Sequence, residues 1–214
     1  SQHQGGADLQ VAPRRGLSRP SVVRRLLALG DSYTIGEGIA PAERWPERLA
    51  ARLREAGLDT CDPEIVARTG WTTDELDAAI DAAAPRAPFA LVTLLIGVND
   101  QYRGRGADAY LAPFGALLDR AIGFADGQAG RVLVPSIPDW GVSPFAARDA
   151  RGAARIGAEI DAFNAVAEAI CAARGAAFVD ITAITRARGA EPAMLADDGL
   201  HPSAAMYTEW TRLA

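Results

Sequence analysis

Lysine is absent from this sequence of 214 residues, in which all 22 basic residues are arginines. Without lysine, the chain has neither a Schiff-base nucleophile nor the lysine with which a P-loop binds phosphate. Histidine is nearly as scarce, since His3 lies close to the N-terminus and only His201 lies in the body of the chain. One histidine in the body of the chain and two distant cysteines do not favour a zinc site. Any step that needs a histidine base therefore depends on His201.

The sequence also lacks the features of chains that bind nucleic acids or membranes. Its formal net charge of -5 provides no attraction to nucleic acid or to anionic lipid. No apolar run approaches the ~20 residues of a membrane-spanning helix, and no signal peptide is visible, which favours a cytoplasmic location. Cys61 and Cys171 are the only cysteines, and a chain of this length needs no disulfide. We therefore expect a small molecule as partner, while no feature of the sequence sets an oligomeric state.

The composition divides the chain into a short N-terminal segment and one domain. Residues 1–21 are rich in Gly, Pro, Gln and Arg without a hydrophobic period, which predicts a flexible arm or an engineered remnant. Residues 22–214 are long enough for one good core and show no internal repeat. We therefore expect a single domain over residues 22–214.

Within this domain, short apolar runs alternate with segments of helical period. The runs span residues 22–30, 64–69, 89–97, 131–137 and 176–181. Several are apolar at nearly every position, which is typical of parallel strands buried on both faces by helices. The alternation predicts a three-layer α/β/α sandwich with a five-stranded parallel sheet, flavodoxin-like, in the strand order 2-1-3-4-5.

Between the strands, apolar residues recur at helical spacing and mark faces that pack on the sheet. Thr72 and Glu75 have the spacing of a capping box at the start of one helix. The expected apolar faces are Trp45, Leu49 and Leu53; Leu111, Phe114, Leu118 and Ile122; and Ile156, Ile160, Phe163 and Ile170.

Residues that could take part in catalysis follow several strands at the point where each strand ends. The first run ends in "GDS" with Ser32, the second is followed by Gly70 and the third by Asn99, while His201 lies in "DDGLHPS" near the C-terminus. Ligands of open parallel sheets bind beyond the carboxyl ends of the strands. We therefore expect a nucleophile, a backbone amide, a carboxamide and a base to meet at one edge of the sheet.

These segments resemble the sequence blocks of the SGNH, or GDSL-type, serine hydrolases. "LALGDSYTIGEG" is similar to the first block, with Ser32 as nucleophile, and "ARTGW" is similar to the second, with Gly70. "IGVND" resembles the third block through Asn99, and "DGLHPS" matches the final Asp-x-x-His block through Asp198 and His201. The resemblance spans nearly the whole predicted domain. It implies a serine esterase that uses neither a metal nor an organic cofactor.

The chemistry of the residues agrees with a catalytic triad. A serine hydroxyl is a weak nucleophile until a base takes its proton, and His201 can act as that base near neutral pH. Asp198 lies three residues earlier and can hold the other ring nitrogen, and its spacing to His201 favours it over Asp197.

The tetrahedral intermediate of ester hydrolysis carries a negative oxygen, which needs hydrogen-bond donors. The family resemblance implies three of them: the backbone N–H groups of Ser32 and Gly70 and the side chain of Asn99. Asp31 is expected to brace the loop rather than to react.

Other interpretations of these residues stay open. Ser32 and Asn99 are common turn residues, and Gly70 can serve as a plain turn glycine. An α/β-hydrolase elbow needs a glycine where Thr34 stands, and "GDSYTIGEG" lacks the G-x-G-x-x-G spacing of a nucleotide-binding loop. We predict a serine esterase. The alternatives are an acyltransferase or carbohydrate deacetylase with the same triad, and a non-catalytic α/β binding module.

Four aromatic residues near the predicted catalytic residues are candidates for substrate binding. They are Tyr33, Trp71, Tyr102 and Trp140. Each either packs under a loop or lines the pocket. If two or more line it, the pocket is a small apolar groove, and we expect acyl chains from acetyl to about hexanoyl to be the best substrates.

Overall fold

The computed structural model describes residues 22–214, so the arm predicted for residues 1–21 lies outside the described residues. The strands are β1 (Leu26–Gly30), β2 (Glu64–Ala67), β3 (Leu91–Leu95), β4 (Val132–Pro135) and β5 (Ala177–Val179). They form one sheet in the order β2-β1-β3-β4-β5, and every neighbouring pair is parallel. The predicted strand order is confirmed.

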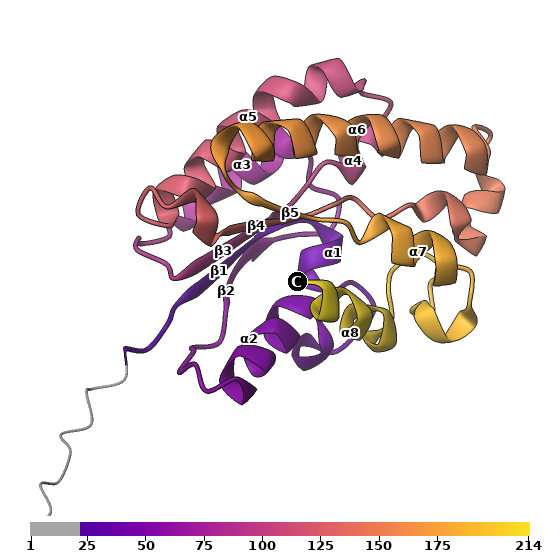
Figure 1. Ribbon diagram of the computed structural model, residues 1–214. Helices are drawn as coiled ribbons and strands as arrows, with labels where there is room; N and C mark the ends of the chain where they lie inside the picture. The colour runs from indigo at the N-terminus through magenta and orange to yellow at the C-terminus, as the bar shows by residue number, and fades with distance from the viewer. Residues whose placement is uncertain (1–21) are drawn as a thin grey trace, which may run out of the picture.

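Helices cover both faces of this sheet. The α-helices are α1 (Ser32–Ile35), α2 (Trp45–Glu55), α3 (Thr73–Ala83), α4 (Val98–Tyr102), α5 (Ala107–Phe124), α6 (Ala153–Arg174), α7 (Thr182–Arg188) and α8 (Ala204–Leu213). The 3-10 turns are η1 (Pro41–Glu43), η2 (Ala129–Arg131), η3 (Trp140–Val142), η4 (Pro144–Arg148) and η5 (Pro192–Met194). Figure 1 shows α3, α5 and α6 on one face and α2 and α8 on the other, which is the predicted three-layer sandwich. None of the helices described for residues 22–214 is long and apolar enough to cross a bilayer.

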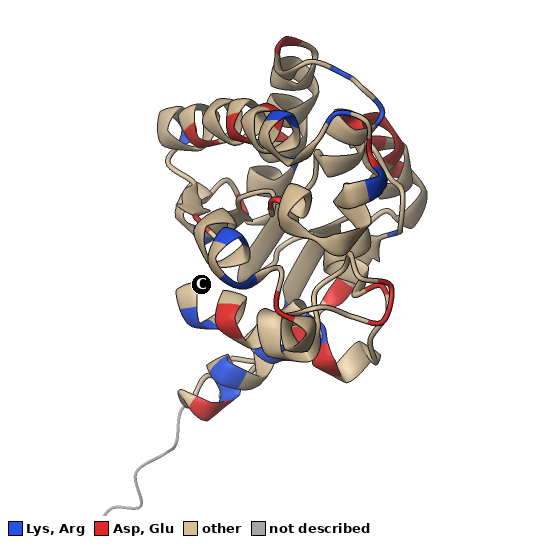
Figure 2. Ribbon diagram, turned by 90° about the vertical axis from the view of Figure 1, so that its right-hand side faces the viewer, with Lys and Arg blue, Asp and Glu red and all other residues tan. Residues whose placement is uncertain are grey.

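The core lies on both sides of the central strands. Every residue of β1 is buried, whereas the edge strands β2 and β5 are partly exposed. On one face, the rings of Tyr207 and Trp210 in α8 meet edge to face with centroids 4.9 Å apart. On the other, Tyr110 of α5 packs on Phe163 of α6 at 4.7 Å. Charged residues lie mainly on the surrounding helices and loops, and the strands are almost free of them (Figure 2).

Two helices test the sequence patterns in detail. Helix α3 begins at the predicted capping box, where the backbone N–H of Thr72 donates to the Glu75 carboxylate at 2.8 Å. The apolar face predicted for α5 is wrong at Leu111, which is 53% exposed. Tyr110 is buried in its place, because its hydroxyl can donate to the carbonyl of Ile96 at 2.8 Å while its ring packs in the core.

The two cysteines are free thiols, so this domain has no disulfide between them. Cys61 is exposed and Cys171 is buried. Burial raises the pKa of the Cys171 thiol to about 11, so this side chain stays protonated and packs as a small apolar group.

Candidate active site

The first strand delivers Ser32 to the carboxyl edge of the sheet. The chain leaves β1 at Gly30, and a Cβ there would lie 2.2 Å from the hydroxyl oxygen of Thr34, so only glycine fits this turn. Asp31 caps the following helix α1, because its carboxylate accepts the backbone N–H of Tyr33 at 3.0 Å. Asp31 thereby braces the turn, as expected. Ser32 is the first residue of α1 and is 4% exposed.

Asp31 is an unusual carboxyl group because it is fully buried and one of its oxygens has no partner within residues 22–214. Burial raises the pKa of Asp31 to about 7; the hydrogen bond from Tyr33 opposes this shift and the charge of Asp100 adds to it. The carboxyl beside the candidate nucleophile is therefore protonated in mildly acidic solution.

This shift predicts that Asp31 makes the protein less stable as the pH rises. The folded protein keeps the proton up to about pH 7, whereas an unfolded chain releases it near pH ~4. Between these values the native state binds more protons, so the free energy of unfolding falls as pH increases and this contribution is lost above pH 7. Urea unfolding measures this effect in wild type and in Asp31→Asn. Between about pH 5 and about pH 7, the free energy of unfolding of wild type should fall by roughly 2–3 kcal/mol relative to that of Asp31→Asn. A constant difference between the two proteins across that range would contradict the prediction.

The loop before α8 holds His201 against Asp198. The Asp198 Oδ2 atom lies 2.5 Å from Nδ1 of His201, and Oδ1 accepts the backbone N–H groups of Leu200 and His201 at 2.9 Å each. Burial acts to raise the pKa of Asp198, but the hydrogen bonds from His201 and Leu200 lower it overall. Asp198 is therefore a carboxylate at neutral pH, and its bond to Nδ1 leaves Nε2 of His201 available as a base. Asp198 makes this contact, in agreement with the spacing argument against Asp197.

The β2–α3 loop and the start of α4 face Ser32. Gly70 has a φ of +90°, a conformation that L side chains rarely adopt, so another residue there would be strained. Asn99 lies in α4, and its Nδ2 atom donates to the backbone carbonyl of Trp71 at 2.9 Å. A carboxamide nitrogen has two N–H groups, so the second one is free to bind a substrate oxygen.

A buried carboxylate that the sequence analysis did not single out joins these two segments. Asp100 is 2% exposed and accepts hydrogen bonds from the backbone N–H and the hydroxyl of Thr73 at 3.0 and 2.8 Å. Arg105 donates to the same carboxylate at 3.0 Å. Because Asp100 follows Asn99 and Thr73 begins α3 just after the Gly70 loop, this contact fixes Asn99 relative to Gly70.

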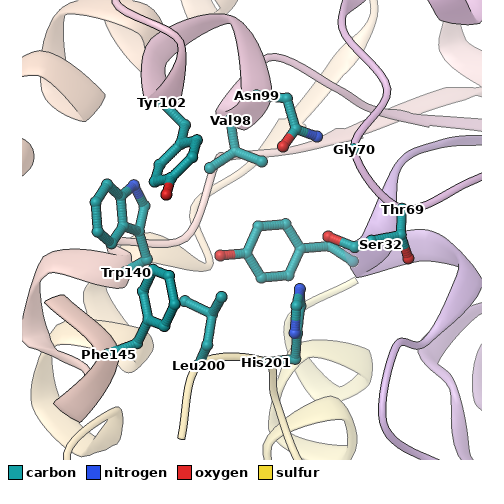
Figure 3. Close-up of a pocket in the computed structure, with 11 residues that line it drawn as sticks. Ser32, Thr69, Gly70, Val98, Asn99, Tyr102, Trp140, Phe145, Leu200 and His201 are labelled. Carbon is teal, nitrogen blue, oxygen red and sulfur yellow. The ribbon is translucent and has the colours of Figure 1, made fainter. Parts of the chain in front are cut away.

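Ser32, Gly70, Asn99 and His201 line one cavity of about 200 Å³. Figure 3 shows the His201 ring pointing toward Ser32, with Asn99 entering the same space from the opposite side. Asp198 lies behind the histidine, where it contacts Nδ1. Ser32, Gly70, Asn99 and His201 therefore surround one cavity, and Asp198 joins them through His201, while the Ser32 hydroxyl makes no hydrogen bond within residues 22–214.

The end of the cavity away from Ser32 holds Tyr102 and Trp140 (Figure 3), and three of the four predicted aromatic residues line the cavity as a whole. Tyr33, Tyr102 and Trp140 line the cavity. Trp71 does not, and its expected role is corrected: it is partly buried and packs against the hydrophobic core. The backbone carbonyl of Trp71 accepts the hydrogen bond from Asn99.

Four further residues line the cavity and were not predicted: Thr69, Val98, Phe145 and Leu200. Three of them are sequence neighbours of predicted site residues, so proximity along the chain was a usable signal for them. Phe145 is different, because it lies in the long loop after β4 and reaches the cavity only through the fold.

The arrangement can perform nucleophilic chemistry on a carbonyl group. A serine hydroxyl, a histidine oriented by a carboxylate and nearby N–H donors are the groups that acyl transfer requires. No cluster of three or more His, Cys, Asp or Glu side chains within residues 22–214 is arranged to hold a metal ion.

Comparisons with known proteins place this geometry in context. The sequence model of the GDSL-like lipase/acylhydrolase family matches residues 28–208. The fold is similar to that of TesA, with 22% identity, a TM-score of 0.67 and coverage of 88% of this chain and 94% of that one. It is also similar to Axe2, an acetylxylan esterase from Geobacillus stearothermophilus, with 20% identity, a TM-score of 0.67 and coverage of 89% and 91%. A member of the lipolytic G-D-S-L family from Veillonella parvula has 18% identity, a TM-score of 0.67 and coverage of 90% and 96%. No curated protein sequence matches this chain significantly.

Proposed function

Because this chain belongs to the GDSL-like lipase/acylhydrolase family, we propose that it hydrolyses carboxylic esters through Ser32, His201 and Asp198. The observation that carries the proposal is the 2.5 Å contact between Asp198 and His201 at a cavity that Ser32 also lines. Hydrolysis of p-nitrophenyl esters of graded chain length tests it. We expect release of p-nitrophenol from the short esters, and failure to cleave any ester of the series would contradict the proposal.

The proposed mechanism follows from the positions of these groups. Nε2 of His201 takes the proton of Ser32 as its Oγ attacks the ester carbonyl, and Asp198 stabilises the resulting imidazolium. The oxyanion receives hydrogen bonds from the backbone N–H groups of Ser32 and Gly70 and from the free N–H of Asn99, and each donor contributes ~3–4 kcal/mol to transition-state stabilisation. His201 then protonates the leaving alcohol, and water repeats the sequence to release the acid.

This mechanism predicts that kcat/KM falls at acidic pH through one ionisation. Hydrogen bonding lowers the pKa of Asp198, so Asp198 stays a carboxylate at neutral pH. Protonated His201 cannot accept the serine proton, so kcat/KM should rise with pH through one ionisation and then reach a plateau. Burial raises the pKa of Asp31 to about 7, so the profile should be measured in Asp31→Asn as well, where the rise of kcat/KM with pH should persist. A flat profile from about pH 5 to about pH 8 would remove His201 from the role of base.

The size of the cavity predicts a preference for short acyl chains. A cavity of ~150 Å³ holds a benzene ring, and this one, of about 200 Å³, is only somewhat larger. Each buried methylene adds up to ~0.8 kcal/mol until the cavity is filled. We expect the highest kcat/KM for acetyl to about hexanoyl esters and a fall beyond roughly octanoyl. Trp140→Ala should move this optimum more than it changes the rate on acetate, whereas a steady rise through palmitoyl esters would contradict the prediction.

Deacetylation of carbohydrate esters is the second candidate. Thr69 on the cavity wall donates its hydroxyl to the carboxylate of Glu37, so polar groups stand at the Ser32 end of the cavity (Figure 3). A polyhydroxylated leaving group could bind there, and the structural neighbour Axe2 is an acetylxylan esterase. A higher kcat/KM for acetylated xylose than for p-nitrophenyl acetate would favour this candidate. Formation of a new ester in the presence of an added alcohol would indicate an acyltransferase.

A further inference from the structure

The apolar wall of the cavity is a cluster of three aromatic rings from two separate segments. Trp140 contacts Tyr102 of α4 with ring centroids 5.4 Å apart, and it contacts Phe145 of η4 at 6.1 Å. Figure 3 shows these rings together at the end of the cavity away from Ser32. Trp140 belongs to a short 3-10 turn in a long loop, so its indole needs support from outside its own segment.

Gln101 supplies that support from α4. It is 1% exposed, and its Oε1 atom accepts the indole N–H of Trp140 at 2.8 Å. Its Nε2 atom donates to the carboxylate of Glu159 in α6 at 2.7 Å. Because an indole N–H only donates and a carboxylate only accepts, these two partners fix the orientation of the amide. Gln101 therefore links the aromatic wall to the body of the domain.

Arg151 packs against two of the same rings. Its guanidinium lies 5.3 Å from the ring centre of Trp140 and 5.5 Å from that of Tyr102, within the range of cation–π contact. It also donates to the backbone carbonyl of Gln101 at 3.2 Å, and it is held by the carboxylate of Asp149 at 2.8 Å. The two rings and the amide are thus held by one network.

Comparison with the other buried tryptophans shows that this support is specific. The indole N–H groups of Trp45 and Trp210 are buried and have no hydrogen-bond partner within residues 22–214. Burial of a tryptophan in this domain therefore does not require a dedicated acceptor. Trp140, which lines the cavity, has one, and the acceptor is two residues from Asn99.

We propose that Gln101 is a positioning residue that sets acyl-chain selectivity by holding the Trp140 indole in place as the wall of the acyl pocket. This inference rests on the proposed esterase function. With the indole fixed, chains longer than the cavity meet a rigid wall. Without the hydrogen bond the ring can turn aside, and longer chains gain room.

The test compares Gln101→Met, which keeps the length of the side chain but not its hydrogen bonds, with wild type on the p-nitrophenyl ester series. We expect the ratio of kcat/KM for the butyrate ester to that for the decanoate ester to fall roughly fivefold, which corresponds to the loss of one hydrogen bond of ordinary strength. The change should lie more in KM than in kcat. Gln128→Met is the matched control, because Gln128 is exposed in the turn after α5, and it should keep the wild-type selectivity. Unchanged selectivity in Gln101→Met would overturn the proposal.

Two further variants separate positioning from a general loss of packing. Trp140→Phe has no indole N–H, so adding Gln101→Met to it should cause no further change in selectivity. The double variant Gln101→Glu/Glu159→Gln exchanges the two side chains. Its carboxylate at position 101 accepts from the Trp140 indole and from the new amide at position 159, so the wild-type chain-length selectivity should return. Additive changes in selectivity when Gln101→Met is combined with Trp140→Phe would count against the proposal. So would a failure of Gln101→Glu/Glu159→Gln to recover the wild-type selectivity.

A measurement independent of activity covers the case in which Gln101→Met does not fold. The indole N–H signal of Trp140, assigned by its loss in Trp140→Phe, should exchange slowly with solvent in the wild-type protein. Exchange as fast as that of the indole N–H groups of Trp45 and Trp210, which are buried without a partner within residues 22–214, would overturn the contact itself. If wild type cleaves no ester, the proposed function fails, and this signal still decides whether Gln101 holds Trp140.

Discussion

Replacing Ser32 with alanine is expected to lower kcat by ~10⁴-fold or more, because it removes the atom that attacks the ester. The Ser32 hydroxyl makes no hydrogen bond within residues 22–214, so the substitution should leave the fold intact. His201→Ala should cause a loss of the same order, since without the base the hydroxyl stays protonated. Steady-state kinetics on p-nitrophenyl butyrate, with circular dichroism to verify folding, measure both effects.

The members of a triad act as a unit, which gives this prediction a sharp control. The Ser32→Ala/His201→Ala double variant should be little slower than either single variant. The chain also offers a matched pair of aspartates: Asp198→Asn should lose most activity, while Asp197→Asn should keep it. Multiplicative losses in the double variant, or near-normal activity in either single variant, would contradict the assignment.

Removing the side chain of Asn99 is expected to lower kcat by roughly 10²–10³-fold, because one oxyanion donor is lost. KM should change little, since the donor acts mainly on the charge that develops in the transition state. The N–H that donates to Trp71 orients the amide, so Asn99 enters the reaction preorganised. Kinetics on a short ester, with kcat and KM determined separately, test this prediction.

Asn164 is the natural control, since it is the only other asparagine in the chain. Its side chain bonds the backbone of Ile137 and the hydroxyl of Thr182, and it does not line the cavity. Asn164→Ala should lower stability without the loss of kcat. A large rise in KM with unchanged kcat in Asn99→Ala would make Asn99 a substrate-binding residue instead.

The fold and the main residues of the candidate site were predictable because both depend on local patterns. Runs such as β1 and β3 are apolar at nearly every position because helices cover both faces of the sheet, and the carboxyl ends of the strands meet at one edge. The error at Leu111 has a physical cause as well. Neighbouring residues compete for the edge of a helix face, and Tyr110 prevailed because the Ile96 carbonyl accepts its hydroxyl.

The supporting residues were not predictable, because their partners are far away in the sequence. Asp100 bonds Thr73 at a separation of 27 residues, and Gln101 bonds Trp140 and Glu159 at separations of 39 and 58. No periodicity or motif encodes such pairs. The side chain of Trp71 likewise could not be placed from its position beside Gly70, since packing against the core decided where it lies.

The most direct test of the central claim is to treat the protein with a fluorophosphonate and to map the adduct by mass spectrometry. The account predicts a single adduct on Ser32 that is absent in Ser32→Ala and forms much more slowly in His201→Ala. No adduct on the folded wild-type protein, or an adduct on a residue other than Ser32, would contradict it.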